Sequence, residues 1–196
     1  MGAEFYGTIF YIAESTHTAG VIWVATDDGR LQITRNGGDS WVDVTPRNLK
    51  GAQINAIEVS PHEPGVAYIA VAGYKMNDFE PYIYKLTDFG KRWMRLDSDL
   101  PDDNFVRVVR ADPEREGLLY AGSEGGLFVS FDDGDHWQSL NMNFPTVPIT
   151  DLRVRQNTLI AATQGRGFWA LDELTVIRQL LSLIHISRAH ETSSNL

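Results

Sequence analysis

The chain has 196 residues, of which 43% are hydrophobic and 22% charged, so it holds enough apolar side chains for one packed domain. Its net charge of -9 argues against nucleic acid or an anionic membrane as a partner, and the absence of cysteine excludes disulfides and thiolate metal sites. No apolar run reaches the length of a membrane span, and the opening MGAEFYGTIFYIAES lacks the charged head and long apolar core of a signal peptide.

Short β-prone segments separated by turn residues follow one another along the chain. The first group, within residues 6–45, comprises Gly7–Ser15, Val21–Thr26, Arg30–Thr34 and Ser40–Val44. The second group, within residues 54–97, comprises Ile54–Ser60, Val66–Ala72, Tyr82–Leu86 and Arg92–Leu96. A longer loop at residues 73–81, GYKMNDFEP, joins the middle two strands of the second group.

Two more groups follow in the second half of the chain. The third, within residues 105–141, comprises Phe105–Ala111, Leu118–Gly122, Leu127–Phe131 and His136–Leu140. The fourth, within residues 149–174, comprises Thr150–Arg155, Leu159–Thr163 and Gly167–Leu171, before a short helix at Thr175–Leu180. Repeats of about 40–50 residues with four strands each predict a β-propeller. We therefore expect an all-β fold over residues 1–180, a partial propeller of about four four-stranded antiparallel blades.

A turn motif, Ser/Thr-x-Asp/Asn-x-Gly-x-x-Trp, recurs between the third and fourth strands. Its Asp or Asn is expected to bind backbone N–H groups one to three residues on, while Gly permits positive φ and Trp offers a large apolar face. Ile22–Thr45 aligns with Leu118–Asn141 at a spacing of 96 residues without a gap. The spacing of 40 residues from Gly125 to Gly165 places Asp172 at the motif acid of blade four, where no Gly or Trp follows, so the fourth motif is degenerate or the repeat ends there. The motif residues are Thr34, Asn36, Gly38 and Trp41; Asp88, Gly90 and Trp93; and Ser130, Asp132, Gly134 and Trp137.

These motifs resemble the Asp-box, or BNR, repeat of sialidases, sortilin-type receptors and xyloglucan-active endoglucanases. The three copies lie 52 and 44 residues apart. The run Tyr6–Leu180 is also similar to long bacterial proteins described as "glycosyl hydrolase, BNR repeat" or sortilin-like, above all over Phe105–Leu140 and Ala161–Leu174. The resemblance implies a propeller, structural rather than catalytic motif residues, an extracytoplasmic location with any signal peptide upstream, and a parent protein with further blades.

The last sixteen residues, LSLIHISRAHETSSNL at 181–196, fit neither the repeat nor the family. LSLIHIS resembles the translation of a sequencing adapter, so we predict a non-native tail and exclude it from the fold. The alternative is an amphipathic helix over Thr175–Ile186 with a polar end. His185 and His190 are not expected to bind metal in either case.

The turns between second and third strands, with the connections between blades, are expected at the end of the propeller opposite the Asp-box turns. Glycoside hydrolysis needs two carboxylates about 5–5.5 Å or about 6.5–9.5 Å apart. The alternative is that these are ordinary turns with solvated carboxylates. The catalytic candidates at this end are Asp27, Asp28, Asp78, Glu80 and Glu124. The ligand-binding candidates are Tyr74, Lys75, Arg107 and Arg166, with Phe79 and Tyr82 as further rings that could stack on sugars.

Arg107, Arg110 and Arg153 all lie on first strands, and three arginines hold the sugar carboxylate in the sialidases that the motifs resemble. The alternative that we prefer makes the first two arginines salt-bridge partners of acidic residues nearby, namely Asp112, Glu114 and Glu116. His17, His62 and His136 lie at turns without metal-ligand spacing, and no nucleophile triad or nucleotide motif is evident. The sequence therefore predicts neither a metal nor a cofactor.

Two functions are compatible with these features. The first is a structural or ligand-binding propeller scaffold, with a carbohydrate, protein or peptide ligand. The alternative is part of a glycoside hydrolase resembling xyloglucan-active endoglucanases or sialidases. A third view is that the chain alone is inactive, because its end blades would expose strand edges. Its expected partners include the remaining blades of a parent propeller, and not nucleic acid or a membrane interior.

Overall fold

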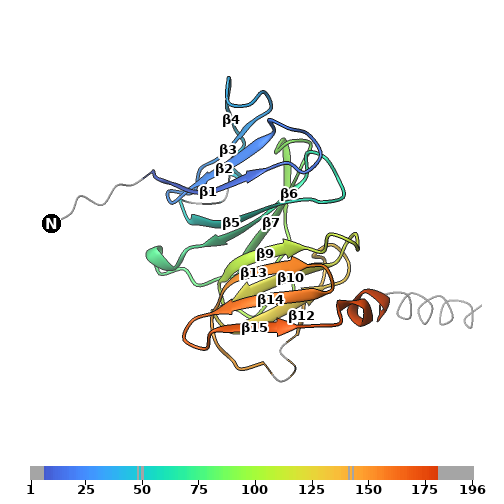
Figure 1. Ribbon diagram of the computed structural model, residues 1–196. Helices are drawn as coiled ribbons and strands as arrows, with labels where there is room; N and C mark the ends of the chain where they lie inside the picture. The colour runs from blue at the N-terminus through green and yellow to red at the C-terminus, as the bar shows by residue number, and fades with distance from the viewer. Residues whose placement is uncertain (1–6, 48, 50, 141, 143, 181–196) are drawn as a thin grey trace, which may run out of the picture.

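The computed structural model describes residues 7–47, 49, 51–140, 142 and 144–180, and the predicted tail at 181–196 lies outside these residues. Four antiparallel sheets follow one another in chain order as blades of a β-propeller (Figure 1). Blade one contains β1 Ile9–Glu14, β2 Ile22–Thr26, β3 Leu31–Thr34 and β4 Val42–Asp43. Blade two contains β5 Gln53–Val59, β6 Ala67–Ala72, β7 Tyr82–Thr87 and β8 Arg92–Arg95, with a 3-10 turn, η1 Tyr74–Met76, between β6 and β7.

Blades three and four follow in chain order. Blade three contains β9 Val106–Ala111, β10 Leu119–Ser123, β11 Gly126–Ser130 and β12 Gln138–Ser139. Blade four contains β13 Ile149–Arg155, β14 Thr158–Thr163 and β15 Phe168–Leu171. The predicted all-β propeller is confirmed. The described part of blade four has three strands instead of four, because the chain leaves β15 as a helix over residues 174–180.

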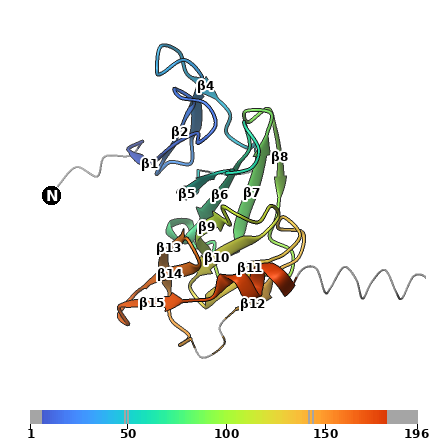
Figure 2. The same cartoon turned by 45° about the vertical axis from the view of Figure 1, so that its right-hand side comes forward.

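The helix packs against blade three (Figure 2). Leu174 and Ile177 are buried in the core, and Arg178 reaches the fully buried carboxylate of Asp112. Asn157 Oδ1 accepts hydrogen bonds from both the backbone N–H and the hydroxyl of Thr175, at 2.7 and 2.8 Å, which caps the start of the helix. In the described ranges, no helix has the length and hydropathy needed to traverse a bilayer.

The gapless alignment of blade one with blade three is wrong by one residue on the second strand. Thr34 pairs with Ile22, whereas the matching Ser130 pairs with Leu119, so the second strands differ by 97 positions and not 96. The cause is the length of the turn between the second and third strands. Three residues close the turn from β2 to β3, whereas two residues close the turn from β10 to β11.

The two-residue turn of blade three also shifts the predicted position of the fourth motif by one residue. A backbone bond from the motif turn to the first-to-second-strand turn recurs in blades one to three, for example Asp133 N to Gly117 O at 2.8 Å. In blade four the corresponding bond runs from Leu174 N to Asn157 O at 3.0 Å. This match makes Glu173, and not Asp172, the counterpart of the motif acid.

The blades pack through two apolar faces each. We call the face toward the next blade the front face and the opposite one the rear face. In blade one the front face includes Trp23 and Leu31, which share a core cluster with Ile57 and Ile69 from the rear face of blade two. A second cluster joins blades two, three and four. Burial of these apolar side chains holds successive sheets together.

The motif tryptophans differ in burial, and the most exposed of them lies on blade one, whose rear face is uncovered in the described residues. Trp137 is 4% exposed and donates from Nε1 to the carbonyl of Leu96 in blade two at 2.7 Å. Trp93 is half-buried and meets Tyr84 edge to face, with ring centroids 5.9 Å apart. Trp41, on the first blade, is 43% exposed.

Candidate functional site

The two ends of the propeller carry different turns. At one end the motif turns bond to the first-to-second-strand turns, for example Gly37 N to Gly20 O at 2.9 Å. At the other end the second-to-third-strand turns bond to the connections between blades, as Gln164 N does to Pro148 O at 2.9 Å. The expected separation of the two sets of turns is therefore present, and we call the second the loop end.

The motif turn of blade one is held by its own side chains. Thr34 Oγ1 accepts a hydrogen bond from Gly38 N at 3.0 Å, and Asn36 Oδ1 accepts one from Ser40 N at 3.0 Å. The amide therefore binds an N–H group four residues on, and the expected reach of one to three residues is wrong. These bonds satisfy backbone donors inside the turn.

Blade three repeats these bonds. Ser130 Oγ accepts from Gly134 N at 2.8 Å, and Asp132 Oδ1 accepts from His136 N at 2.9 Å. The Nδ1 of His136 also lies 2.7 Å from Asp132 Oδ2. That hydrogen bond, followed by the carboxylate charge, raises the pKa of His136. Burial pushes the pKa of Asp132 upward, but the hydrogen bonds from His136 and Ser130 outweigh it and keep the pKa below its ordinary value.

The second motif folds differently because Leu86 stands where the others have a hydroxyl. Asp88, Phe89 and Gly90 all have positive φ, at 51°, 56° and 85°. The Asp88 carboxylate meets Lys91 at 3.3 Å across the exposed turn.

The catalytic candidates at the loop end are each bound to a partner of their own. Asp27 Oδ1 accepts from the backbone N–H groups of Gly7 and Thr8 at 2.9 and 2.8 Å. Asp28 accepts from the hydroxyl of Thr26 and lies 3.6 Å from Arg30. Both carboxylates thus brace the start and the turn of blade one.

The remaining candidates lie on blades two and three. Asp78 accepts from Tyr82 Oη at 2.9 Å, and burial, followed by this bond, raises the pKa of Tyr82 to about 12. Glu80 meets Arg95 at 3.6 Å, and Glu124 pairs with Arg107. Within the described residues, no group of three or more His, Asp or Glu side chains is placed to hold a metal ion.

An aromatic cluster lies between the 73–81 loop and blade three. Tyr74 stacks on Phe105 with centroids 5.2 Å apart and planes at 21°, and Phe79 lies 6.4 Å from the same ring. Phe105 is buried beneath them, while Tyr74 and Phe79 are 39% and 41% exposed. The Arg107 guanidinium lies 5.0 Å from the Phe105 centroid. We call Tyr74 and Phe79 the ring platform.

The loop that carries the platform is braced internally. Met76 N and Asp78 N both donate to Gly73 O, at 2.8 and 3.2 Å. Lys75 Nζ donates to Gln53 Oε1 at 2.8 Å, which ties the loop to β5. The rings are therefore held in place before any ligand arrives, which lowers the entropy lost on binding.

The other candidate residues lie apart from the platform. Tyr82 is half-buried against Tyr84, with centroids 6.5 Å apart, so it is not a freely exposed ring. Arg166 is exposed on the second-to-third-strand turn of blade four, where its carbonyl accepts from Trp169 Nε1 at 3.1 Å.

A charged cluster on the inner strands was not predicted as a unit. Arg110, whose side chain is 6% exposed, donates to Asp151 Oδ1 at 2.7 Å and to Tyr11 Oη at 3.0 Å. Its other face lies 3.6 Å from Glu58 Oε2. Burial raises the pKa of Glu58 to about 7, against the opposing charge of Arg110. The cluster lines a cavity of about 400 Å³ to which Arg153 also contributes.

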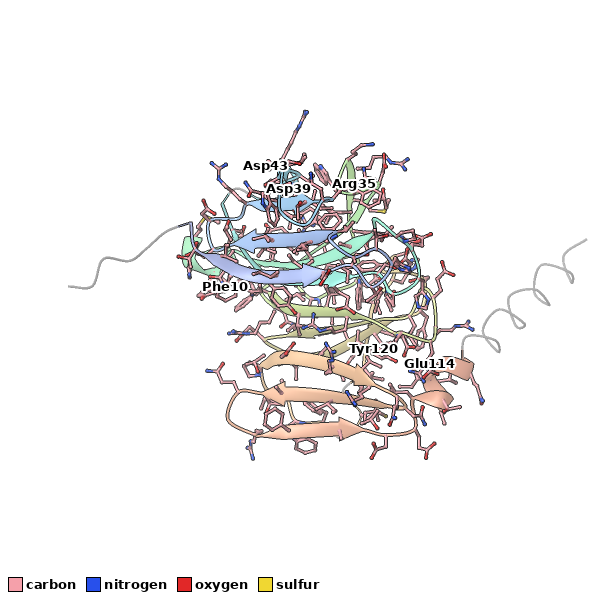
Figure 3. The ribbon with its side chains drawn as sticks, turned by 45° about the horizontal axis from the view of Figure 1, so that its top comes forward. Phe10, Arg35, Asp39, Asp43, Glu114 and Tyr120 are labelled. Atoms are coloured by element: carbon pink, nitrogen blue, oxygen red, sulfur yellow. The ribbon has the colours of Figure 1, made fainter. Side chains whose placement is uncertain are left out.

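The salt-bridge partners that the sequence predicts for Arg107 and Arg110 are wrong. Arg107 pairs with Glu124, and Arg110 with Asp151 and Glu58, because their side chains turn toward the loop end and the inner cavity. Asp112 and Glu114 instead bind Arg178 of the helix, at 3.0 and 2.8 Å. Figure 3 shows Glu114 beside that helix.

Two histidines link blades at the motif end, a role that the sequence reading missed. His17 Nε2 lies 3.1 Å from Ser60 O, and His62 Nε2 lies 2.7 Å from Asp112 O. Since a carbonyl only accepts, each Nε2 carries the proton. The available signal was a Ser-x-His pair that begins at Ser15 and again at Ser60.

Comparisons place this geometry among known propellers. No protein-family model matches the chain. The oligoxyloglucan-reducing end-specific xyloglucanase of Emericella nidulans is 28% identical over 109 residues, which is 55% of this chain and 14% of that protein. The GH74 enzyme of Niastella koreensis has a TM-score of 0.67 at 18% identity, covering 86% of this chain and 28% of that one.

YCF48 is also similar in structure. The protein from Cyanidioschyzon merolae has a TM-score of 0.62 at 19% identity, covering 88% of this chain and 55% of that one. A structure of YCF48 bound to D1 peptide has a TM-score of 0.61 at 18% identity, with 86% and 51% coverage. The chain is thus a β-propeller with the fold of xyloglucanases and YCF48, and it spans about half or less of each of them.

Proposed function

We propose that this chain is a ligand-binding β-propeller scaffold and that the ring platform on the 73–81 loop is its binding element. The observation that supports this most is the contrast at the loop end. The two platform rings are about two-fifths exposed on a braced loop, whereas every candidate carboxylate is engaged by a neighbour within its own blade.

A carbohydrate is the ligand class that suits the platform best. Each aromatic ring offers a flat apolar face with a polar surround, and such faces stack against the C–H face of a pyranose. Polar groups flank Phe105, on which Tyr74 stacks: Asn104 precedes it and accepts from Gly125 N at 2.5 Å, and Arg107, paired with Glu124, lies 5.0 Å from its centroid. The similarity to xyloglucanases supports the same ligand class.

The test is calorimetric titration of the chain with xyloglucan oligosaccharides. Loss of both rings in a Tyr74→Ala, Phe79→Ala variant is expected to weaken binding at least about tenfold, since fully burying one such ring contributes about 1.5–3 kcal/mol. Met94→Ala is the matched control, because Met94 is 50% exposed on β8 of the same blade outside the loop. Equal affinity of the ring variant and wild type refutes the platform, and binding of a peptide but no oligosaccharide refutes the ligand class.

The second candidate function is a glycoside hydrolase, favoured by the 109-residue match to a xyloglucanase. On this proposal the acids are Asp78, which lies in the platform loop, and Glu124, on the turn between β10 and β11 of blade three. Release of reducing sugar from xyloglucan, abolished by Asp78→Asn or Glu124→Gln, is the supporting result. Unchanged rates in both variants remove these residues from the chemistry.

Two finer assignments belong to the same proposal. The recurring side-chain bonds of Thr34 with Asn36 and of Ser130 with Asp132 support an Asp-box propeller of the sortilin-like kind. An extracytoplasmic location follows from that kinship, and fractionation of the native host with an antibody to the chain tests it directly.

A further inference from the structure

The two end blades each leave one apolar face open, and these faces are complementary halves of one repeated interface. In the described part of the chain, no segment covers the rear face of blade one. Its apolar side chains Ile9, Ile12 and Trp41 are exposed by 57%, 60% and 43%, and Phe10, at the bulge of the same edge strand, by 52%. Figure 3 shows Phe10 on β1. A hollow of about 520 Å³ lies on this face between Val24, Gln32 and Trp41.

Strand register shows that the rear face of blade one is equivalent to faces that a preceding blade covers in blades two and three. Ile12 pairs with Val24, as Ile57 pairs with Ile69 in blade two and Val109 with Ala121 in blade three. Ile57 and Val109 are 1% and 0% exposed because the preceding blade covers them, whereas Ile12 is 60% exposed. The same position is therefore built for burial and lacks its cover.

The front face of blade four is uncovered in the same way. Phe168 pairs with Ala162, as Leu31 pairs with Ala25, Ile83 with Ala70 and Leu127 with Gly122. The counterparts Leu31, Ile83 and Leu127 are 0%, 0% and 3% exposed, whereas Phe168 is 82% exposed. A large aromatic thus stands where every earlier blade packs against the next one.

The motif glycines show the same difference between blade one and the blades that follow it. A Cβ on Gly90 would lie 2.6 Å from Val44 of blade one, and a Cβ on Gly134 would lie 2.8 Å from Leu96 of blade two. Nothing lies within 4 Å of the corresponding position on Gly38. The rear face of blade one is thus shaped for the front face of another blade.

We propose that a second copy of this chain occupies these faces, with the front face of blade four docked on the rear face of blade one of the partner copy. Both halves of the interface are present on one chain, and the contact continues the interface that already joins blade one to two and two to three. Because the two surfaces differ, the contact is head to tail, and such contacts close into rings when the rotation permits. Two copies give about eight blades, within the usual range of about 4–8 for propellers.

The experiment is sedimentation equilibrium of the full chain over a wide range of concentration. The expected result is a dimer of twice the 22.0 kDa chain mass. Phe168→Asp and Ile12→Lys, at residues 82% and 60% exposed and so compatible with folding, are each expected to weaken association at least about tenfold. Met94→Asp, 50% exposed on an interior blade, is the control and is expected to leave the mass unchanged.

Mixing the two variants separates head-to-tail docking from other arrangements. The Phe168→Asp chain keeps an intact rear face and the Ile12→Lys chain an intact front face, so the mixture contains one undamaged interface and is expected to associate more tightly than either variant alone. Association that Ile12→Lys breaks but Phe168→Asp does not would mean a rear-to-rear dimer and overturn the proposal. A monomer at every concentration also overturns it, and assigns the open faces to further blades of a longer chain.

Discussion

Replacing Glu58 with glutamine is expected to change the pH dependence of stability in a defined window. Burial raises the pKa of this carboxyl from 4.5 to about 7, because its side chain is 22% exposed and Arg110 gives it only partial compensation. The Arg110 guanidinium lies 3.6 Å from Glu58 but 2.7 Å from Asp151, so much of its charge is directed elsewhere.

The sign follows from proton binding. Between pH 4.5 and about 7 the folded chain keeps the Glu58 proton while the unfolded chain loses it. The free energy of unfolding therefore falls with rising pH by about 1.4 kcal/mol per unit, or about 3 kcal/mol in all. The contribution is fully present below pH 4.5 and is lost as the pH rises through about 7.

The assay is urea unfolding of wild type and Glu58→Gln from pH 4 to pH 8.5. Taking the difference between the two proteins cancels the titration of all other groups. Glu58→Gln is expected to gain about 3 kcal/mol relative to wild type between the ends of this range. Asp151→Asn is a second variant in the same cluster: because the Asp151 charge also raises the pKa of Glu58, its loss is expected to narrow the pH window. A difference that stays constant with pH would show that Glu58 is ionised in the fold and that the burial argument is wrong.

Two further predictions concern the packing of the helix and of the motif turns. Arg178→Ala leaves the fully buried carboxylate of Asp112 without its cation and is expected to lower the free energy of unfolding by about 3 kcal/mol, measured by urea unfolding; a loss below about 1 kcal/mol would mean that the helix does not dock in solution. Gly134→Ala is expected to lower the melting temperature more than Gly38→Ala, because both have positive φ but only the first drives a Cβ into the preceding blade. Equal shifts in a thermal melt would contradict that packing.

The blades were predictable because their signals are local. Alternating apolar residues and turn residues at fixed spacing define each strand, and every expected strand is present within a few residues. The loop at 73–81 was also predictable from its length, as was the exposure of Tyr74 on it.

What escaped prediction depends on contacts between blades. Arg110 meets Tyr11 from a position 99 residues away, and no spacing in the sequence shows that two innermost strands converge there. The one-residue error in aligning blades one and three arose because a three-residue and a two-residue turn look alike in a gapless comparison. Turn length is a geometric property, and it moves a whole strand by one residue.

The interfaces between blades are alike in shape but differ in chemistry, and this difference distinguishes one blade from another. Lys85 stands in the strand position that Ile33 fills in blade one, and it pairs with Asp133 of blade three, which also accepts from Tyr68 Oη at 2.5 Å. An isoleucine there would leave the Asp133 carboxylate with one partner fewer, at a cost of about 1–3 kcal/mol. The interface of blades one and two instead places Arg35 over the ring of Phe89 at 3.9 Å. Blades that share one fold therefore do not offer interchangeable neighbours.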